Sequence, residues 1–258
     1  MTTTPQTPDP TRSPQPQQTQ QTLQALQDTN PSIRLRAALA TGTTPDPRYV
    51  DHLIERSATE PEFYVRDMLT WALTRHPAAL TLPRLLQEVR SERTQARSQA
   101  LHTLSKIADP HAWPAITPDL LTDTDDEVAR SAWRAAVVLV PQDEETALAA
   151  TLATQLGRGE RETQLSLSQA LVALGTPIEP ILHEATNAQD PHVRAHALAT
   201  RQLLHDPDAG FTLAIEEAKR TVALTGTPHD TQGTPHDGHS NTPYDGQGTP
   251  QDGQWTPC

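Results

Sequence analysis

The residues of this chain that could do chemistry are scattered and form no recognisable catalytic motif. The sequence contains no Gly-rich phosphate loop, no Cys/His pair with metal-ligand spacing and no Gly-x-Ser-x-Gly elbow. His183 and Glu184 form one His-Glu pair, and a metal centre would need more ligands converging from elsewhere. His229, His236 and His239 stand near aspartates in a polar segment, which we interpret as a flexible tail. We therefore predict no catalytic residue, no bound metal and no cofactor.

Binding chemistry is better represented, in a set of large or charged residues at a recurring spacing. On three consecutive predicted helices, these residues lie one, two, five or nine positions after a marker residue. The apolar residues of the same helices lie three, seven and ten positions after the marker, so the two sets point in different directions. We name the first set the candidate strip, and it comprises Met68, Trp71, Arg75, Gln99, His102, Lys106, Arg130 and Arg134, with Asp67 beside it.

The candidate strip combines cations with an aromatic side chain in an otherwise acidic protein. Trp and Arg are enriched at binding hot spots, so we predict that the strip receives an acidic or aromatic segment of another protein. The alternative is that Trp71 packs between adjacent helices and that the charges form a solvated face. We expect Trp133 and Trp113 to serve packing.

A repeated helical unit must position these residues, and its clearest copy lies between Glu60 and Pro77. A Val-Arg pair opens a helix there, and Val65, Leu69 and Leu73 fall on one side of it at helical spacing. The marker, which is the second residue of this pair, recurs at positions 34, 66, 97, 129, 164 and 194, in steps of 30 to 35 residues. A nearly constant step of this size indicates stacked helical hairpins.

A second apolar helix is predicted between successive marker helices. The candidate ranges are 48–56, 80–89, 113–121, 144–156, 178–185 and 211–224, and 19–27 is the outer helix of the first pair. We expect the charged helix 211–224 to cap the stack, because a terminal repeat needs a polar outer face. An Asn or Asp precedes a proline at five predicted helix starts, at Asn30, Asp46, Asp109, Asp190 and Asp206. No alternating β-branched run predicts a strand.

Composition divides the chain into a folded domain and two tails, and the net charge narrows the classes of partner that it could bind. Residues 1–18 are rich in Thr, Pro and Gln, and residues 225–258 in Gly, Thr, Pro, Asp and His, so we expect both to be disordered around a folded domain at 19–224. The formal net charge is −12, and −8 remains without the four aspartates of the C-terminal segment. Phosphate backbones and anionic lipids repel a domain with this negative charge, so we expect neither nucleic acid nor a membrane as partner.

Cellular context can also be inferred, although less directly. The single cysteine, Cys258, excludes an internal disulfide, and no apolar run has the length of a signal segment or a membrane span. We therefore expect a cytoplasmic protein, and we also expect it to be a monomer.

The segments Asp190-Pro-His-Val-Arg-Ala-His-Ala-Leu-Ala199 and Val65-Arg-Asp-Met-Leu-Thr-Trp-Ala-Leu73 resemble the HEAT-repeat family, in particular its short bacterial, phycobilisome-lyase-like class. The resemblance covers residues 20–224. It implies an all-α fold, an α-solenoid of about six HEAT-like helical hairpins whose marker helices line a concave face.

The family resemblance also implies roles for residues. Arg34, Arg66, Arg97 and Arg194 occupy marker positions, and such arginines usually pair with acidic or carbonyl groups of a neighbouring repeat. Ala129 and Gln164 interrupt this series.

The function that the resemblance favours is a non-enzymatic protein-binding scaffold or adaptor. The alternative is a HEAT-type enzyme or enzyme accessory, either lyase-like or a metal-dependent oxidoreductase. A site similar to that of deoxyhypusine hydroxylase would need several His-Glu pairs, and this chain offers only His183-Glu184. Nucleic-acid binding would want a strongly basic face.

Overall fold

The computed structural model describes residues 16–206 and 210–225, and every regular element within these ranges is helical. The described residues belong to one compact unit, and the second unit, 227–258, lies outside them. The predicted tail residues 1–15, His229, His236, His239 and Cys258 therefore lie outside the description as well.

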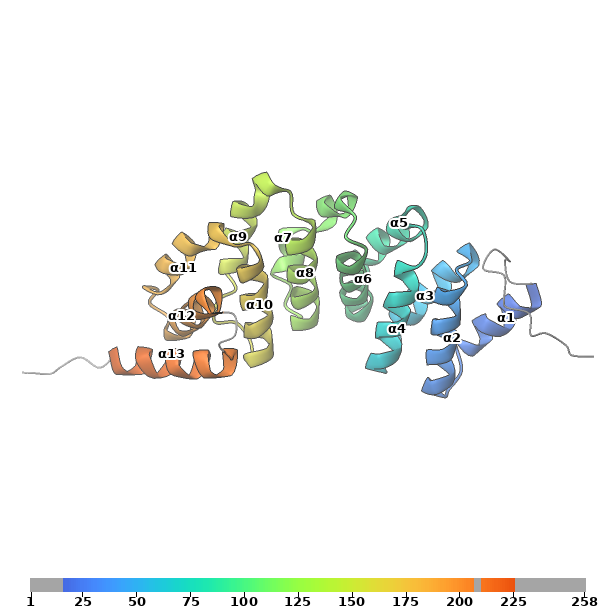
Figure 1. The fold of residues 1–258 in the computed structure, drawn as a ribbon, viewed down its shortest axis with the longest axis horizontal. Coiled ribbons are helices and arrows are strands. Elements are labelled where there is room, and N and C mark those ends of the chain that lie inside the picture. Colours follow the sequence, from blue (N-terminus) through green and yellow to red (C-terminus); the bar gives the residue numbers. More distant parts are fainter. Residues whose placement is uncertain (1–15, 207–209, 226–258) are drawn as a thin grey trace, which may run out of the picture. The chain divides into compact units, whose positions relative to one another are not determined.

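Each predicted marker residue lies near the start of a helix. The marker helices are α2 (Pro31–Thr43), α4 (Phe63–Thr74), α6 (Thr94–Ile107), α8 (Asp126–Leu139), α10 (Arg161–Ala173) and α12 (Pro191–His205). Successive marker helices contact one another from α2 through to α12, so they form one continuous layer (Figure 1).

A second layer is formed by shorter helices. These outer helices are α1 (Pro16–Ala25), α3 (Val50–Ser57), α5 (Ala78–Glu88), α7 (Pro118–Leu121), α9 (Glu145–Ala153) and α11 (Glu179–Ala185), with 3-10 turns η1 (Pro47–Tyr49), η2 (Pro110–Ala115), η3 (Gln142–Glu144) and η4 (Thr176–Ile178). Each outer helix contacts the marker helix that follows it. The six pairs confirm the predicted α-solenoid of helical hairpins.

Two boundaries differ from the sequence expectation. Helix α1 begins at Pro16, so residues 16–18, which we expected to be disordered, are helical. The predicted helix 113–121 is divided into η2 and α7, because Pro114 and Pro118 each lack the N–H that a continuous helix would need.

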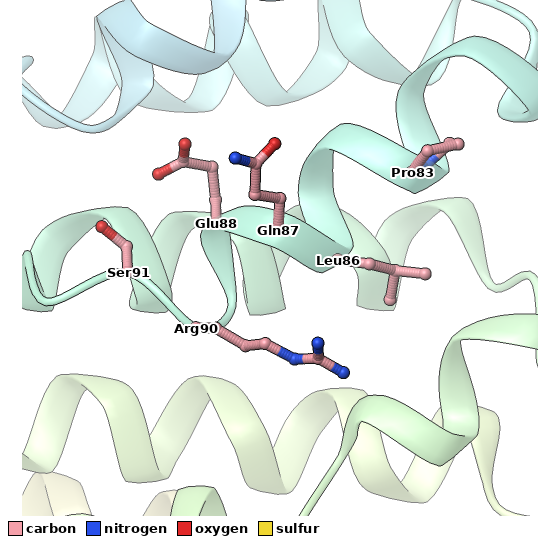
Figure 2. Close-up of a pocket in the computed structure, with 6 residues that line it drawn as sticks. All are labelled: Pro83, Leu86, Gln87, Glu88, Arg90 and Ser91. Carbon is pink, nitrogen blue, oxygen red and sulfur yellow. The ribbon is translucent and has the colours of Figure 1, made fainter.

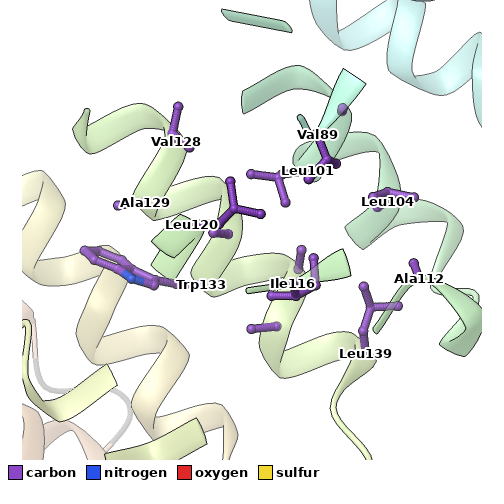
Figure 3. Packing of buried hydrophobic residues seen from close by; sticks show 14 of the residues in the cluster. Val89, Leu101, Leu104, Ala112, Ile116, Leu120, Val128, Ala129, Trp133 and Leu139 are labelled. Atoms are coloured by element: carbon purple, nitrogen blue, oxygen red, sulfur yellow. The ribbon is translucent and has the colours of Figure 1, made fainter. Parts of the chain in front are cut away.

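The core runs through both layers as one cluster of buried apolar side chains (Figure 3). Trp133 is its largest member, with no exposed surface, and its indole Nε1 donates a hydrogen bond to the carbonyl oxygen of Leu121 at 2.8 Å. Trp113 is half-buried against the same cluster and donates to Glu144 at 3.0 Å. The packing roles predicted for both tryptophans are confirmed.

Helix starts follow the predicted capping chemistry. The side chains of Asn30, Asp46, Asp109 and Asp190 each accept a hydrogen bond from the backbone N–H two residues later. Asp206 differs, because it is the C-cap residue of α12.

The marker arginines hold the loop of their own hairpin. In all four, Nη1 donates to the carbonyl oxygens five and six residues earlier, at 2.6 to 3.2 Å, and these arginines are Arg34, Arg66, Arg97 and Arg194. Arg34 and Arg97 also reach the following repeat, through Glu60 and Asp123. The predicted structural role is confirmed, but the carbonyl partners belong to the same hairpin and not to a neighbour.

The two repeats without a marker arginine use other side chains for this purpose. Gln164 donates from Nε2 to the carbonyl oxygen of Gly159, which lies five residues earlier. Where Ala129 stands, Arg158 of the following loop donates to the carbonyl oxygen of Asp123 at 2.5 Å and pairs with Asp126. The loop of each hairpin is therefore held by hydrogen bonds from an arginine or a glutamine side chain to its carbonyl oxygens.

Helix α13 (Phe211–Thr225) is placed differently from the outer helices. It packs on α12, the marker helix before it, and α13 lies crosswise beneath α12 in Figure 1. A second buried cluster joins the two helices, with Phe211, Ala214, Ile215, Ala218 and Val222 against Ala195 and Ala199. The helix that we expected at 211–224 exists, but it covers the side of α12 that corresponds to the candidate strip.

Candidate functional site

The candidate strip lies on α4, α6 and α8, and its members differ in exposure. Trp71, Arg75 and Lys106 are exposed. The half-buried members are Met68, Gln99, His102, Arg130 and Arg134. The strip is therefore most open on α4 and most enclosed on α8.

Trp71 is partly packed between helices and partly exposed, so it fits both interpretations that the sequence left open, packing and binding. Its ring lies against Gly42 of α2 so closely that a Cβ built on Gly42 would stand 2.3 Å from Trp71 Cζ3. The residue nevertheless keeps 38% of its surface exposed, and Leu39, at the same helical position of α2, keeps 47%. One face of the indole thus packs between helices while part of the residue remains open to solvent.

His102 lies among the charges of the strip. Burial lowers the pKa of His102 to about 4, and the positive charges of Arg134 and Lys106 add to the effect, while Asp67 opposes it. His102 is therefore neutral at pH 7 and supplies polar surface between two cations.

The simple offset rule fails where α6 and α8 approach each other. Ser98 and Ser131, one and two positions after their markers, are buried, and their hydroxyls lie 3.0 Å apart. Val138, nine positions after its marker, is 50% exposed and belongs beside the strip. Small hydroxyl side chains allow this close approach, which spacing along a single helix cannot reveal.

Arg130 and Arg134 line a pocket at the end of the strip. The pocket has a volume of about 340 Å³ and lies among α8, α10 and the start of α13. We name it the arginine pocket, and its lining residues are Arg130, Arg134, Arg161, Glu162, Leu165, Ser166, Gln169, Phe211 and Thr212.

Hydrogen bonding within the arginine pocket is incomplete. Arg130 uses Nη1 for Glu127 at 2.9 Å and lies 3.7 Å from Glu162, while Arg134 donates from Nη2 to Ser131 at 3.2 Å. The buried Nε atoms of both arginines have no hydrogen-bond partner among the described residues, and neither has the buried Oγ of Ser166.

Sequence reasoning missed the part of the pocket that comes from α10 and α13. Arg161 lies three positions before the marker Gln164, outside the offsets that we considered. Ser166 lies at the second offset, which the strip included on other helices, so extending the strip to α10 would have found it. No local signal could have placed Phe211 beside these residues.

A larger hollow of about 630 Å³ lies along the end of α5, lined by Pro83, Leu86, Gln87, Glu88, Arg90 and Ser91. Figure 2 shows Gln87 and Glu88 pointing to one side of the chain and Arg90 to the other. Because its polar groups diverge, this hollow lacks the convergent groups of a binding site.

The His-Glu pair that an alternative metal site would use lies on the surface. His183 and Glu184 are both exposed on α11. Across residues 16–206 and 210–225, no three His, Cys, Asp or Glu side chains gather closely enough to hold a metal ion. None of the helices in these ranges is both long and apolar enough to cross a membrane.

Comparison with known proteins gives one family match. The model of HEAT repeats matches residues 11–74, and comparison with curated proteins found no match. The matched region contains the hairpins α1–α2 and α3–α4, and the later pairs repeat their stacking and their loop ties. Residues 11–74 are therefore similar to HEAT repeats, and the hairpins that follow them are stacked in the same way.

Proposed function

We propose that this protein is a non-enzymatic binding scaffold whose marker-helix layer captures a segment of another protein. The resemblance to HEAT repeats makes this the expected class, because each repeat adds surface rather than a catalytic pocket. The proposal keeps the cytoplasmic location, the monomeric state and the bacterial, phycobilisome-lyase-like class inferred from the sequence.

The observation that carries the proposal is the position of α13. Its apolar stripe lies against Ala195 and Ala199, which are one and five positions after the marker Arg194, and against the half-buried Leu198 and Leu203. These offsets correspond to the candidate strip on the other marker helices. One side of the layer thus already receives an amphipathic helix of the same chain.

The residues at these offsets continue on the marker helices toward the N-terminus, where no helix among the described residues covers them. At the offset of Ala199, α4 has Trp71 and α2 has Leu39, both exposed. Arg75 and Lys106 flank this apolar surface with positive charge. A matching segment would be helical, with an apolar or aromatic stripe and acidic flanks, because burial and charge complementarity would then act together.

The test is partner capture from a native extract by the full-length protein. We expect Trp71→Ala combined with Arg134→Ala to abolish the bands retained by the wild type, with helicity unchanged by circular dichroism. A matched control pair, Phe63→Ala with Arg90→Ala, changes an exposed aromatic and an exposed arginine outside the strip. Equal retention by the strip variant and the wild type would refute the proposal.

A further inference from the structure

The arginine pocket concentrates unsatisfied hydrogen-bond donors to an unusual degree. Seven buried side-chain atoms of the described residues have no hydrogen-bond partner, and three of them, Arg130 Nε, Arg134 Nε and Ser166 Oγ, belong to residues that line this one pocket. Ser166 is only 5% exposed. An unpaired buried polar group costs stability, so a cluster of three calls for a ligand that accepts hydrogen bonds.

The charge of the lining favours an anion as the ligand. Arg130, Arg134 and Arg161 contribute three positive charges, and Glu162 is the one acidic residue of the lining. Burial lowers the pKa of Arg134, and the charge of Arg130 lowers it further, with Glu127 opposing. An anion between the two guanidinium groups would relieve this repulsion.

Helix α13 adds to the preference for an anion. Its first residues, Phe211 and Thr212, line the pocket, and its first turn contains no acidic side chain. The N-terminal end of a helix carries a partial positive charge and N–H groups that lack intrahelical partners. This contribution supplements the arginines and would not make a site alone.

Charge and the number of acceptor oxygens favour phosphate over carboxylate. A phosphate monoester offers three acceptor oxygens and a charge of about −1.5 to −2 at pH 7. A carboxylate has only two acceptor oxygens and a single negative charge, so it balances the three arginines of the lining less completely. The pocket volume of about 340 Å³ lies within the range of small-ligand sites.

We propose that the arginine pocket binds a phosphate group, through the Nε–H groups of Arg130 and Arg134 and the hydroxyl of Ser166, with Arg161 at the rim. The inference rests on the proposed function for the origin of that group, because the pocket adjoins the strip that would hold the partner. A phosphorylated residue of the captured segment is the occupant that this arrangement favours.

The test begins with inorganic phosphate and full-length protein, by titration calorimetry and thermal unfolding at constant ionic strength. We expect saturable binding of phosphate and weaker binding of acetate. Ser166→Ala removes one donor without changing charge, and Arg134→Gln removes one charge. Each should weaken phosphate binding about tenfold or more, since a hydrogen bond to a charged group contributes that much.

Arg90→Gln is the matched control, because it removes an exposed arginine that lies outside both the candidate strip and the arginine pocket. It should bind phosphate within about twofold of the wild type, a difference smaller than one ordinary hydrogen bond. The proposal is overturned if the wild type binds no phosphate up to about 10 mM, where a site of about 1 mM affinity would be occupied. It is also overturned if Arg90→Gln loses as much affinity for phosphate as Ser166→Ala does. If Arg134→Gln fails to fold, the comparison of Ser166→Ala with Arg90→Gln still tests the proposal.

A second experiment distinguishes a phosphorylated partner segment from a free phosphate ion as the occupant of the pocket. A helical peptide with one phosphoserine is compared with its unphosphorylated form and with inorganic phosphate. Tighter binding of the phosphopeptide supports a phosphorylated partner, and equal binding of phosphopeptide and inorganic phosphate supports a free anion in the same pocket. A protein that binds no phosphate but still captures its partner through Trp71 loses this inference and keeps the proposed function.

Discussion

At the scale of residues, the contact between Trp71 and Gly42 explains how a large aromatic side chain can be both structural and accessible. Gly42 leaves the space in which the indole lies against α2, and the part of Trp71 that this contact does not cover stays exposed. A glycine inside a helix costs stability relative to alanine, so its presence here has a packing reason.

We predict that Gly42→Ala destabilises the protein by about 1–3 kcal/mol, the usual cost of overpacking. The new Cβ would meet Trp71 Cζ3 at 2.3 Å and the backbone Cα of Ala72 at 2.9 Å, so α2 and α4 must separate. Urea unfolding measures the loss. Gly210→Ala is the control, because its Cβ would meet no atom within 4 Å and stability should stay within about 0.5 kcal/mol. A stable Gly42→Ala protein would show that this contact is loose.

At the scale of elements, helix ends are set by local chemistry that the sequence largely reveals. Gly175 follows α10 with a positive φ of 68°, as a C-terminal glycine should. Ala108 follows α6 with a φ of 56°, the only non-glycine residue with positive φ among those described. An alanine in this conformation carries a steric cost that glycine avoids.

We therefore predict that Ala108→Gly raises the free energy of unfolding by about 1 kcal/mol, because it relieves the left-handed strain at the end of α6. Thermal and urea unfolding would both detect the change. The reverse substitution, Gly175→Ala, should lower stability by a similar amount. If Ala108→Gly instead destabilises the protein, the entropy gained by the unfolded chain outweighs the strain.

At the scale of the whole molecule, stability comes from contacts between neighbouring repeats, and several of these depend on protonation. Buried Glu60 accepts hydrogen bonds from Arg34 and Arg56. Burial alone would raise the pKa of Glu60, but hydrogen bonds from Arg34, the Glu62 amide and Arg56 lower it to about 2.

His196 joins α12 to α10 and to the loop that precedes α10. Its Nδ1 accepts a hydrogen bond from the Gly157 amide, so Nε2 carries the proton and lies 3.0 Å from the carbonyl oxygen of Gln164. Burial lowers the pKa of His196 to about 4.

The pKa values of Glu60 and His196 predict that the stability of the fold decreases in two separate pH ranges. Both pKa values are lower in the folded than in the unfolded protein, so each group stabilises the fold above its unfolded pKa and loses that effect as the pH falls. His196 should contribute a loss between pH 6.5 and about 4, and Glu60 a further loss between pH 4.5 and about 2. Urea midpoints measured across this range would display both.

Two variants test which group causes the loss of stability in each pH range. His196→Gln should flatten the upper window relative to the wild type, although His102 will still contribute there. Glu60→Gln should flatten the lower one and cost about 3 kcal/mol at pH 7, because it leaves the buried Arg34 without its charged partner. Parallel pH profiles for wild type and both variants would exclude these two groups as the source.

The sequence by itself determined the helical hairpins, the marker positions and most helix starts, because periodicity, prolines and capping side chains act within a few residues of one another. It also named Arg130 and Arg134, whose offsets place them off the apolar stripe. Only the tertiary structure decided that α13 lies on α12, that Arg158 takes the place of an arginine at position 129, and that Ser166 and Arg161 share a pocket with Arg134. The physical reason is that an apolar stripe or an unpaired charge shows that a residue needs a partner, while the stacking of distant helices determines which partner it meets.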